Sequence, residues 1–506
     1  MSQGPPAAVE AAGLTKRFGA LTALDEVSVR FAPGSFHALL GENGAGKSTL
    51  AKCIMGYYRA DGGELLIGGR KRTVTNPRQA HRLGLGMVYQ HFTLVPNMTV
   101  MENLVLGRER LPAVIDWRAE RARLEEFLAA MPFRLGLDRR VAGLAAGEKQ
   151  KLEILKQLLL GHRFLILDEP TSVLTPSEAA EILGLMRRMA DEGKLTVVLI
   201  THKLREVEEF AREVTVLRGG RVAGHGPAGD LSHGDLVRMM IGREQVAPPA
   251  ARVGGPRGGA VLALRDLTAS SDRGVTAVRD VSLEVGAGEI VGVAGVSGNG
   301  QTELVEVLAG QRRAESGSVR VAGEPYRPTR EEIGRKRVFL LPEEPLRNGC
   351  VRSMTVAENL AIRNFDAPEN IRWRWFPRRQ AVLARARDLI ERYGIKTQGP
   401  NARIETLSGG NVQRTVLARE LSAEVSVLIA QNPCTGLDLQ AVAEIRNRIV
   451  GVRNAGAAVL LLSEDLDEIL ELSDRIVVMF EGRFVYETPR ETADVQVIGR
   501  HMAGRG

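Results

Sequence analysis

The sequence predicts an α/β protein that contains two copies of one domain. Residues 21–56 and 275–310 share an order of features: an alternating polar and apolar run, the pattern G-x-x-x-x-G, and an apolar helical pattern. Four widely spaced landmarks repeat at a nearly constant offset of about 260 residues. They pair Lys47 with Gln301, Leu144 with Leu407, Asp168 with Gln431, and His202 with Glu464. The constant offset indicates a duplicated domain, and two copies are too few for a solenoid.

The predicted core of each domain is a mostly parallel sheet. Residues 36–40, 164–168 and 196–200 are short, continuous apolar runs, as expected for strands that are buried on both faces. Helical patterns lie between these runs. Residues 117–131 and 148–160 read as consecutive helices with no strand between them, which predicts a helical subdomain inserted between strands of the sheet.

Composition divides the chain at residues 247–259. This segment, APPAARVGGPRGG, is rich in Ala, Pro and Gly and has no periodicity, which is typical of a linker. We therefore expect a first domain at residues 1–246 and a second at residues 260–506.

The overall composition is that of an ordinary globular protein, with 44% apolar and 25% charged residues. The net charge of +7 has no long Lys/Arg block and no aromatic or zinc signature beside it, so we expect no nucleic-acid partner. Cys53, Cys350 and Cys434 form no C-x-x-C pair and predict neither a disulfide framework nor a zinc site. The N-terminus does not read as a secretory signal. Apolar runs fall far short of the roughly 20 residues that cross a bilayer, so we expect no transmembrane segment.

Residues 41–49 form a candidate phosphate-binding loop. They follow a predicted strand, precede a predicted helix and match G-x-x-x-x-G-K-[ST], whereas a simple glycine-rich turn would not need the lysine. Glycines let backbone N–H groups converge on a phosphate, and the helix N-terminus adds partial positive charge. Lys47 would supply a full charge to the phosphates, and Ser48 a hydroxyl to Mg²⁺. The candidate ATP-binding residues here are Gly41, Glu42, Asn43, Gly44, Ala45, Gly46, Lys47, Ser48 and Thr49.

Two carboxylates and a histidine follow neighbouring predicted strands. Asp168 can hold Mg²⁺ through water, and Glu169 can polarise an attacking water. His202 directly follows the run at 196–200, where ligand sites of α/β folds lie, and can reach the terminal phosphate. A solvated acidic turn and a structural histidine are the alternatives, and the phosphate loop favours the catalytic interpretation.

These motifs resemble the nucleotide-binding domain of ATP-binding-cassette (ABC) transporters over nearly the whole chain. The resemblance implies two tandem P-loop NTPase domains, each with a mostly parallel core sheet, an antiparallel β subdomain and an inserted helical subdomain. It implies that Gln90 contacts Mg²⁺, takes part in catalysis and couples to membrane subunits, and that Phe18 stacks on adenine. For Phe18 the alternative is an ordinary half-buried strand residue.

The resemblance also assigns a signature motif to each half. LSGGNVQ at 407–413 is the intact one, and its Ser408, Gly409 and Gly410 are expected to contact ATP. LAAGEKQ at 144–150 is the diverged one, with Ala145 where serine is expected. Asp438, in TGLD at 435–438, matches the aspartate of the next family loop and joins the expected ATP-binding residues.

The second half departs from the family motifs at the positions expected to bind phosphate, bind Mg²⁺ and activate water. Gln301 replaces the loop lysine, Gln431 and Asn432 replace the two carboxylates, and Glu464 replaces the histidine. A neutral amide cannot counter phosphate charge or act as a base. Family members bind ATP between halves arranged head to tail, so each site uses one phosphate loop and the other half's signature. The intact first phosphate loop would pair with the intact second signature, and the altered second loop with the altered first signature. We therefore expect one complete hydrolytic site and one degenerate site.

Fused halves with GVAGVSGNGQTEL, LSGGNVQ and LSEDLDEI resemble the carbohydrate-uptake group of importers, and residues 90–107 resemble its nucleoside branch. The resemblance implies an ATPase that uses ATP and Mg²⁺ to power import of nucleosides or simple sugars at the cytoplasmic face of the cell membrane. Its expected partners are two membrane permease subunits and, indirectly, an extracytoplasmic substrate-binding protein. Phe92, Leu94, Val95 and Met98 are expected to form the permease docking surface, and packing into the helical subdomain is the alternative.

Three other classes fit the sequence less well. A two-cassette translation factor acting on ribosomes is expected to keep both ATP sites and to have a long charged helical linker, whereas the linker here is short. A DNA-repair cassette ATPase would need zinc cysteines or a long coiled coil. A pure scaffold would not need the complete first site.

Overall fold

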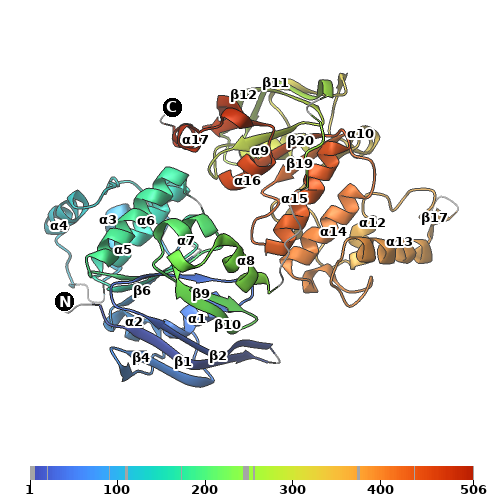
Figure 1. Cartoon of the computed structure of the whole chain (residues 1–506). Helices are drawn as coiled ribbons and strands as arrows, with labels where there is room; N and C mark the ends of the chain where they lie inside the picture. The colour runs from blue at the N-terminus through green and yellow to red at the C-terminus, as the bar shows by residue number, and fades with distance from the viewer. Residues whose placement is uncertain are drawn as a thin grey trace. The chain divides into compact units, whose positions relative to one another are not determined.

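The computed structural model describes residues 6–19, 21–89, 92–108, 112–172, 174–242, 250–254, 257–372, 376–437 and 439–504. Gln90 and Asp438, two of the predicted site residues, lie outside the described residues. The chain forms two compact units, Met1–Gln245 and Val246–Gly506, and each is described by itself (Figure 1).

The first unit contains ten strands and eight helices among the described residues. The strands are β1 (Val9–Phe18), β2 (Leu21–Phe31), β3 (Phe36–Leu40), β4 (Gly62–Ile67), β5 (Arg70–Lys71), β6 (Leu85–Val88), β7 (Phe164–Asp168), β8 (Thr196–Ile200), β9 (Glu213–Arg218) and β10 (Arg221–Pro227). The helices are α1 (Lys47–Ile54), α2 (Pro77–Arg82), α3 (Val100–Leu106), α4 (Trp117–Ala129), α5 (Ala146–Leu159), α6 (Pro176–Asp191), α7 (Leu204–Phe210) and α8 (His233–Ile241).

The core sheet of the first unit has the order β10-β9-β3-β8-β7-β6. All neighbours pair in parallel except β10, which is antiparallel to β9. The three predicted strands are β3, β7 and β8, and every residue in them is buried. Continuous apolar runs therefore marked strands covered on both faces, and the predicted parallel core is confirmed.

Two further parts complete the first unit. Strands β2, β1, β4 and β5 form an antiparallel sheet, and α1 lies between it and the core sheet, with α6 and α7 on the opposite side (Figure 1). The predicted helices at 117–131 and 148–160 are α4 and α5, which with α3 form the helical subdomain between β6 and β7.

The second unit repeats this architecture. Its strands are β11 (Arg257–Ser270), β12 (Thr276–Ala287), β13 (Ile290–Ala294), β14 (Ser316–Val321), β15 (Glu324–Pro325), β16 (Val338–Leu341), β17 (Ile371–Arg372), β18 (Phe376–Pro377), β19 (Val427–Gln431), β20 (Ala458–Ser463), β21 (Arg475–Phe480) and β22 (Arg483–Pro489). Its helices are α9 (Gln301–Leu308), α10 (Arg330–Lys336), α11 (Pro345–Asn348), α12 (Val356–Ala361), α13 (Arg379–Arg392), α14 (Gly409–Leu421), α15 (Leu439–Asn454), α16 (Leu466–Leu472) and α17 (Val495–Met502).

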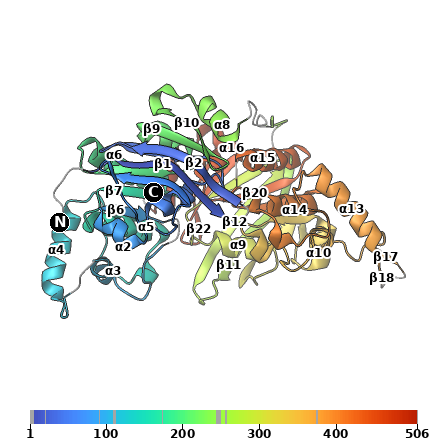
Figure 2. The same ribbon diagram turned by 90° about the horizontal axis from the view of Figure 1, so that it is seen from below.

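The core sheet of the second unit has the order β16-β19-β20-β13-β21-β22, which matches the first sheet strand for strand. Its antiparallel sheet, β12-β11-β14-β15, matches as well. Figure 2 shows α13 and the β17–β18 hairpin at the end of the unit that lies away from β11 and β12. The shared topology confirms two cassette domains of the predicted class, and among the described residues no helix is long and apolar enough to span a membrane.

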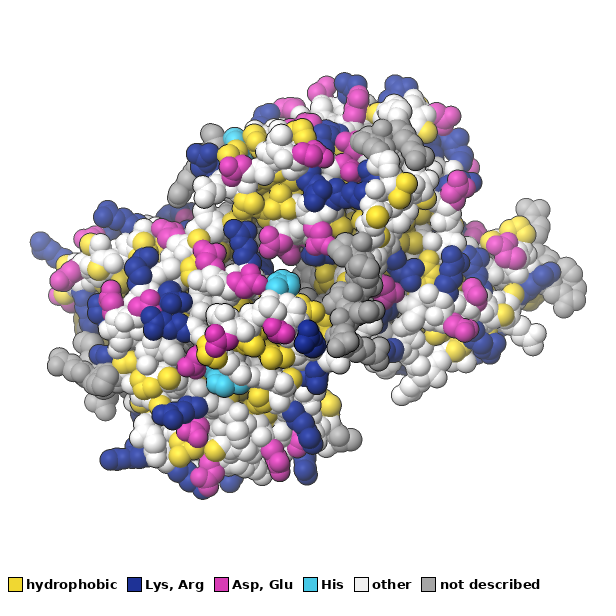
Figure 3. Space-filling model, viewed as in Figure 1, with side chains coloured by type: hydrophobic (Ala, Val, Ile, Leu, Met, Phe, Trp, Pro, Cys, Tyr) yellow, Lys and Arg dark blue, Asp and Glu magenta, His cyan; other side chains and the backbone are white. Residues whose placement is uncertain are grey.

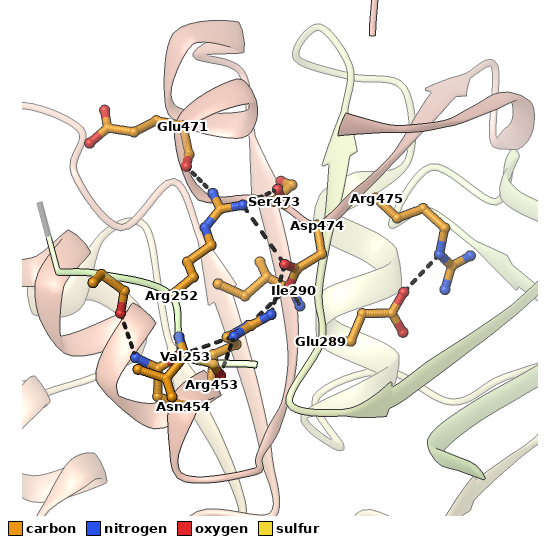
Figure 4. A network of polar contacts seen from close by, with 11 residues as sticks. Arg252, Val253, Glu289, Ile290, Arg453, Asn454, Glu471, Ser473, Asp474 and Arg475 are labelled. Atoms are coloured by element: carbon orange, nitrogen blue, oxygen red, sulfur yellow. Dashed lines mark hydrogen bonds and ion pairs between the residues drawn. The ribbon is translucent and has the colours of Figure 1, made fainter. Parts of the chain in front are cut away.

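Part of the segment predicted to be a linker is hydrogen-bonded to the second unit (Figure 4). Arg252 donates to the carbonyl of Ser473 at 3.0 Å, and Val253 N donates to Asn454 Oδ1 at 3.1 Å. Arg453 donates to the carbonyl of Val253 at 3.1 Å and to Asp474 at 3.0 Å. The first strand of the second unit, β11, begins at Arg257, which lies within the segment 247–259 that was predicted to be a linker. Composition could not show this, because the anchoring groups are distant in sequence.

Candidate functional site

The phosphate loop of the first unit joins β3 to α1 and has a backbone that only glycine fits. Gly41 and Gly46 have φ angles of 148° and 105°, in the region that L side chains rarely adopt. A Cβ on Gly41 would lie 2.3 Å from the carbonyl oxygen of Leu217, and one on Gly46 would lie 2.7 Å from that of Ala23. The backbone of the loop therefore packs directly against the backbone of Leu217 and Ala23, which holds it rigid for phosphate binding.

Lys47 lies inside this loop, with 7% of its surface exposed. Its Nζ donates to the carbonyls of Gly41 at 2.6 Å and Glu42 at 3.0 Å. Burial lowers the pKa of Lys47, and the charges of Glu169, Asp168 and Glu42 act against that shift. The loop thus binds the ammonium group of Lys47 with its own carbonyls. A bound phosphate could replace these carbonyls as the partner of the ammonium group.

Asp168 ends β7 and faces the start of α1. It is buried, and burial followed by the charge of Glu169 raises its pKa, while a hydrogen bond from Ser48 and the charge of Lys47 act in the opposite direction. A hydroxyl and a carboxylate side by side beside a phosphate loop are the oxygen ligands that Mg²⁺ prefers.

Glu169 and His202 meet at the carboxyl ends of β7 and β8. His202 Nδ1 lies 3.2 Å from Glu169 Oε1, and Glu169 N donates to the carbonyl of Ile200 at 2.9 Å. Burial acts to raise the pKa of Glu169, but the hydrogen bond and charge of His202, with Lys47, hold it below its ordinary value. Glu169 also has φ of 48°, a strained conformation for a residue with a side chain.

Phe18 lies at the end of β1 with 42% of its surface exposed. Its ring contacts Tyr58 edge-on at 5.1 Å between centroids, and Lys16 Nζ lies 5.3 Å from its centroid. An exposed aromatic ring near a phosphate loop offers a surface on which a base can stack.

The two signature segments form the starts of equivalent helices, α5 and α14, but differ in chemistry. Ser408 immediately precedes α14, and its Oγ accepts a hydrogen bond from Asn411 Nδ2 at 2.8 Å. Ser408 and Gly409 are exposed, and a Cβ on Gly409 would meet no atom within 4 Å. Ala145 precedes α5, is equally exposed and carries no hydroxyl.

At the equivalent site of the second unit, the lysine and the two carboxylates of the first unit are replaced by neutral amides. Gln301 takes the place of the loop lysine, and Gln431 Nε2 donates to Thr302 Oγ1 at 3.2 Å. Asn432 keeps a positive φ of 41° and accepts a hydrogen bond from Glu464 N at 2.9 Å. The backbone conformation of Glu169 is thus retained at Asn432, where the carboxylate is lost.

Glu464 stands where the first unit has His202. Burial and the charge of Glu343, which occupies the position of Gln90, raise the pKa of Glu464 to about 7, and a hydrogen bond from Ser297 opposes the shift. Both Glu464 and Glu343 can be recognised in the sequence as substitutions, but the effect of the Glu343 charge on Glu464 could not be predicted, since it depends on how the strands pair.

The segment after Gln90 is fixed to the helical subdomain by polar groups. Thr93 Oγ1 donates to Glu153 Oε1 at 2.8 Å, and Val95 N donates to Asn103 Oδ1 at 2.8 Å. Phe92 and Val95 are exposed, whereas Leu94 and Met98 are half-buried. In the second unit Val351 N donates to Asn359 Oδ1 at 2.8 Å, and Val351 and Met354 are exposed.

The surface of each unit is mixed in charge. On the faces that Figure 3 shows, Lys and Arg side chains alternate with Asp and Glu side chains within each unit. The net charge of +7 is therefore dispersed there and forms no single basic stripe.

The donors and acceptors of the first site fit a Mg–nucleotide. A buried lysine, a glycine cradle and a helix N-terminus suit phosphate, and Ser48 with Asp168 suits Mg²⁺. An exposed Phe18 suits an adenine ring. The hydrogen bonds that join Thr171 and Thr201 to Glu206, on the loops that carry Glu169 and His202, were not predicted from the sequence. The spacing of Thr171, Thr201 and Glu206 in the sequence carries no recognisable pattern.

Comparison with known proteins is consistent with this geometry. A model of the ABC transporter family matches residues 24–172 and 278–435. The ribose import ATP-binding protein RbsA 1 of Rubrobacter xylanophilus is 42% identical, over 98% of each chain. The nucleoside import ATP-binding protein NupA of Lactococcus lactis is 38% identical, over 97% of each chain. The guanosine import ATP-binding protein NupO of Bacillus subtilis is 38% identical, over 98% of this chain and 97% of its own.

One solved structure spans both units. The archaeal ribosome recycling factor, solved in complex with a ribosomal stalk protein, has a TM-score of 0.63 and covers 97% of this chain and 92% of its own. At 20% identity, it shows a shared fold alone.

Proposed function

Because the chain belongs to the ABC transporter family, we propose that it is the ATP-hydrolysing subunit of an importer for nucleosides or simple sugars. The observation that carries the proposal is the constellation of Lys47, Asp168, Glu169 and His202 at the carboxyl ends of β3, β7 and β8 in the first unit. Membership of this family makes the chain an ATPase, and the constellation supports the first half as the one that would perform hydrolysis.

Each residue of the first site has a distinct role in the proposal. Lys47 holds the β- and γ-phosphates, and Glu169 orients the attacking water and accepts a proton from it. His202 supports the Glu169 carboxylate through their 3.2 Å contact and faces the terminal phosphate. Ser48, Asp168 and Gln90 would hold Mg²⁺, which neutralises phosphate charge when it is bound. Phe18 stacks on adenine.

We assign one hydrolytic and one degenerate site. The second half supplies Ser408, Gly409, Gly410 and Asp438 to the nucleotide held by the first phosphate loop. The first half supplies only the diverged signature with Ala145 to the second loop. The exposed Ser408 hydroxyl and the exposed methyl group of Ala145 support this asymmetry. So do the amides in place of the cation and the carboxylates of the second unit.

The boundaries of the halves are proposed at residues 1–246 and 260–506, joined by the segment 247–259. The compact units Met1–Gln245 and Val246–Gly506 support the first boundary. The hydrogen bonds of Arg252 and Val253 attach this part of the joining segment to the second half.

Permease subunits are the proposed direct partners, and the site of action is the cytoplasmic face of the membrane. The relatives are named as import ATP-binding proteins, which motivates this step. Exposed Phe92 and Val95, on a segment whose backbone is fixed by Glu153 and Asn103, form a surface for a short permease helix. In the second unit a cleft of about 450 Å³ lies beside the end of β16, lined by Phe339, Pro342 and several arginines, and it suits the same purpose. A substrate-binding protein outside the cell would act indirectly.

Reconstitution tests the proposal. The chain and the permease subunits encoded next to its gene are placed in liposomes with the cognate binding protein, and ATP-dependent uptake of labelled nucleosides and pentoses is measured. Uptake of one class that Lys47→Ala abolishes supports the proposal. Co-sedimentation with ribosomes, with no membrane complex formed, would replace it with the translation-factor alternative.

A further inference from the structure

We propose that Glu206 is a positioning residue that ties together the two loops carrying Glu169 and His202. The inference rests on the proposed function, because it concerns the hydrolytic site of the first half. Glu206 lies in α7, accepts hydrogen bonds from Thr171 and Thr201, and would act through the two loops that these threonines belong to.

The buried carboxylate of Glu206 accepts a hydrogen bond from one hydroxyl group of each loop. Thr171 Oγ1 donates to one oxygen of Glu206, and Thr201 Oγ1 donates to the other at 2.9 Å. Thr171 lies two residues after Glu169, and Thr201 directly precedes His202. Glu206 has 8% of its surface exposed, and Thr171 and Thr201 have 2% each, so the bridge is shielded from water. Hydrogen bonds to a charged group in such a setting are the stronger kind.

Lys203 reinforces the bridge from the loop that follows β8. Its backbone N–H donates to Thr201 Oγ1 at 3.1 Å, so the hydroxyl both donates and accepts. Its Nζ lies 3.4 Å from the carbonyl of Thr171 and 3.8 Å from Glu206. The lysine thus partly compensates the buried charge of Glu206 and adds a second connection between the loops.

The two catalytic side chains need such support from behind. His202 has 47% of its side chain exposed, so packing alone does not fix its ring. Glu169 has a strained φ of 48°, a conformation that persists only where the surroundings impose it. A bridge between the residues beside them fixes both loops and thereby the 3.2 Å contact.

The second unit contains the same device in altered form and so provides a control. Glu468, in α16, accepts from Ser463 Oγ at 2.7 Å, and Ser463 stands at the position of Thr201. Cys434 replaces Thr171, and Arg446 lies 3.8 Å from Glu468. This bridge supports loops that carry Asn432 and Glu464, so weakening it should not slow hydrolysis.

The experiment compares Thr201→Ala with Ser463→Ala in the full-length chain, with Thr201→Ser as the rescue variant. We expect Thr201→Ala to lower kcat about tenfold with KM for ATP nearly unchanged, because small misplacements of catalytic groups cost rate rather than binding. Thr201→Ser keeps the hydroxyl and should restore kcat to within about twofold of the parent. Ser463→Ala should leave kcat unchanged, because Ser463 adjoins Glu464 and the bridge it forms supports no proposed base or histidine.

Equal rates for Thr201→Ala and Ser463→Ala would overturn the inference, as would a Thr201→Ser variant as slow as Thr201→Ala. If Thr201→Ala does not fold, Thr171→Val, which keeps the side-chain shape and removes the other hydroxyl, gives the same comparison. A parent chain with no ATPase activity would instead contradict the proposed function, so the two failures are distinguishable.

Discussion

Glu169 Oε1 lies 3.2 Å from Nδ1 of His202, at the ends of β7 and β8. At the equivalent positions of the second half, Asn432 Oδ1 accepts a hydrogen bond from the backbone N–H of Glu464 at 2.9 Å. Both halves therefore connect the two loops, but only in the first half is the pair a carboxylate and an imidazole. The predictions below follow from this asymmetry.

Replacement of the proposed base should stop turnover without preventing ATP binding. Glu169→Gln keeps the shape of the side chain but cannot accept a proton, and loss of a general base typically lowers rate by about 10²–10⁴-fold. Steady-state phosphate release and retention of labelled ATP are the measurements. Asn432→Asp in the second half is the matched control and should leave the rate unchanged. Near-normal phosphate release from Glu169→Gln would remove Glu169 from this role.

The two signature segments should respond unequally to substitution. Ser408→Ala removes a hydroxyl proposed to contact the γ-phosphate held by Lys47, and we expect turnover to fall roughly tenfold, the effect of losing a transition-state hydrogen bond of about 1.4 kcal/mol. Ala145→Ser restores a hydroxyl opposite a loop that carries Gln301, and should change turnover little. ATPase rates decide between the assignments. A several-fold gain from Ala145→Ser with no effect of Ser408→Ala would show the sites to be inverted.

Glu464 should make stability depend on pH. Its pKa rises from 4.5 to about 7 in the folded protein, so the carboxyl is neutral in both states at pH 4 and is ionised at a cost in the folded state at pH 8. Stability is therefore lost as pH rises from 4.5 through about 7. Glu464→Gln removes that cost and should stabilise the protein by roughly 1–3 kcal/mol at pH 8, with little effect at pH 4.

Melting temperatures of Glu464→Gln and the parent at pH 4, 6 and 8 provide the measurement. Glu343→Gln should give a smaller shift of the same sign, because it removes one of the two causes of the raised pKa and leaves burial in place. A difference between variant and parent that is constant with pH would show that Glu464 does not titrate in this range.

Charged residues on the exposed segment after Gln90 should prevent assembly with permeases. Phe92→Asp with Val95→Asp puts carboxylates on a proposed docking surface while leaving the buried anchors Glu153 and Asn103 intact. We expect loss of co-purification with the permeases and unchanged basal ATPase. Val114→Asp, at a residue that is 85% exposed, is the control. A collapsed melting transition of the double variant would instead favour a core-packing role.

The anchor of residues 250–253 should contribute to the stability of the second half. Arg252 donates to the carbonyls of Glu471 and Ser473 and lies 3.8 Å from Asp474 (Figure 4). Arg252→Ala should lower the free energy of unfolding by about 1–3 kcal/mol, as expected when hydrogen-bond acceptors, one of them part-buried, lose a charged donor. Arg273→Ala, at an exposed arginine, is the control for loss of charge. Equal stability of the two variants would show that the segment acts only as a tether.

The strands and the phosphate loop could be predicted from the sequence because their signals are local. Continuous apolar runs can be buried on both faces only in a covered sheet, so β3, β7 and β8 were predicted with their observed bounds. A glycine with positive φ before a lysine at the first turn of a helix is likewise a local requirement. The duplication could be read for the same reason, since each copy repeats its own local pattern.

Other features depend on residues that meet only after folding, and the tertiary structure alone decided them. Whether residues 250–253 form a free linker or part of a domain is set by Asn454 and Asp474, about 200 residues away in the chain. The bridge at Glu206 joins residues from three segments, and Glu343 raises the pKa of Glu464 across the sheet. Sequence patterns report the period and burial of one segment, whereas these contacts depend on strand order, which places distant carboxylates and hydroxyls side by side.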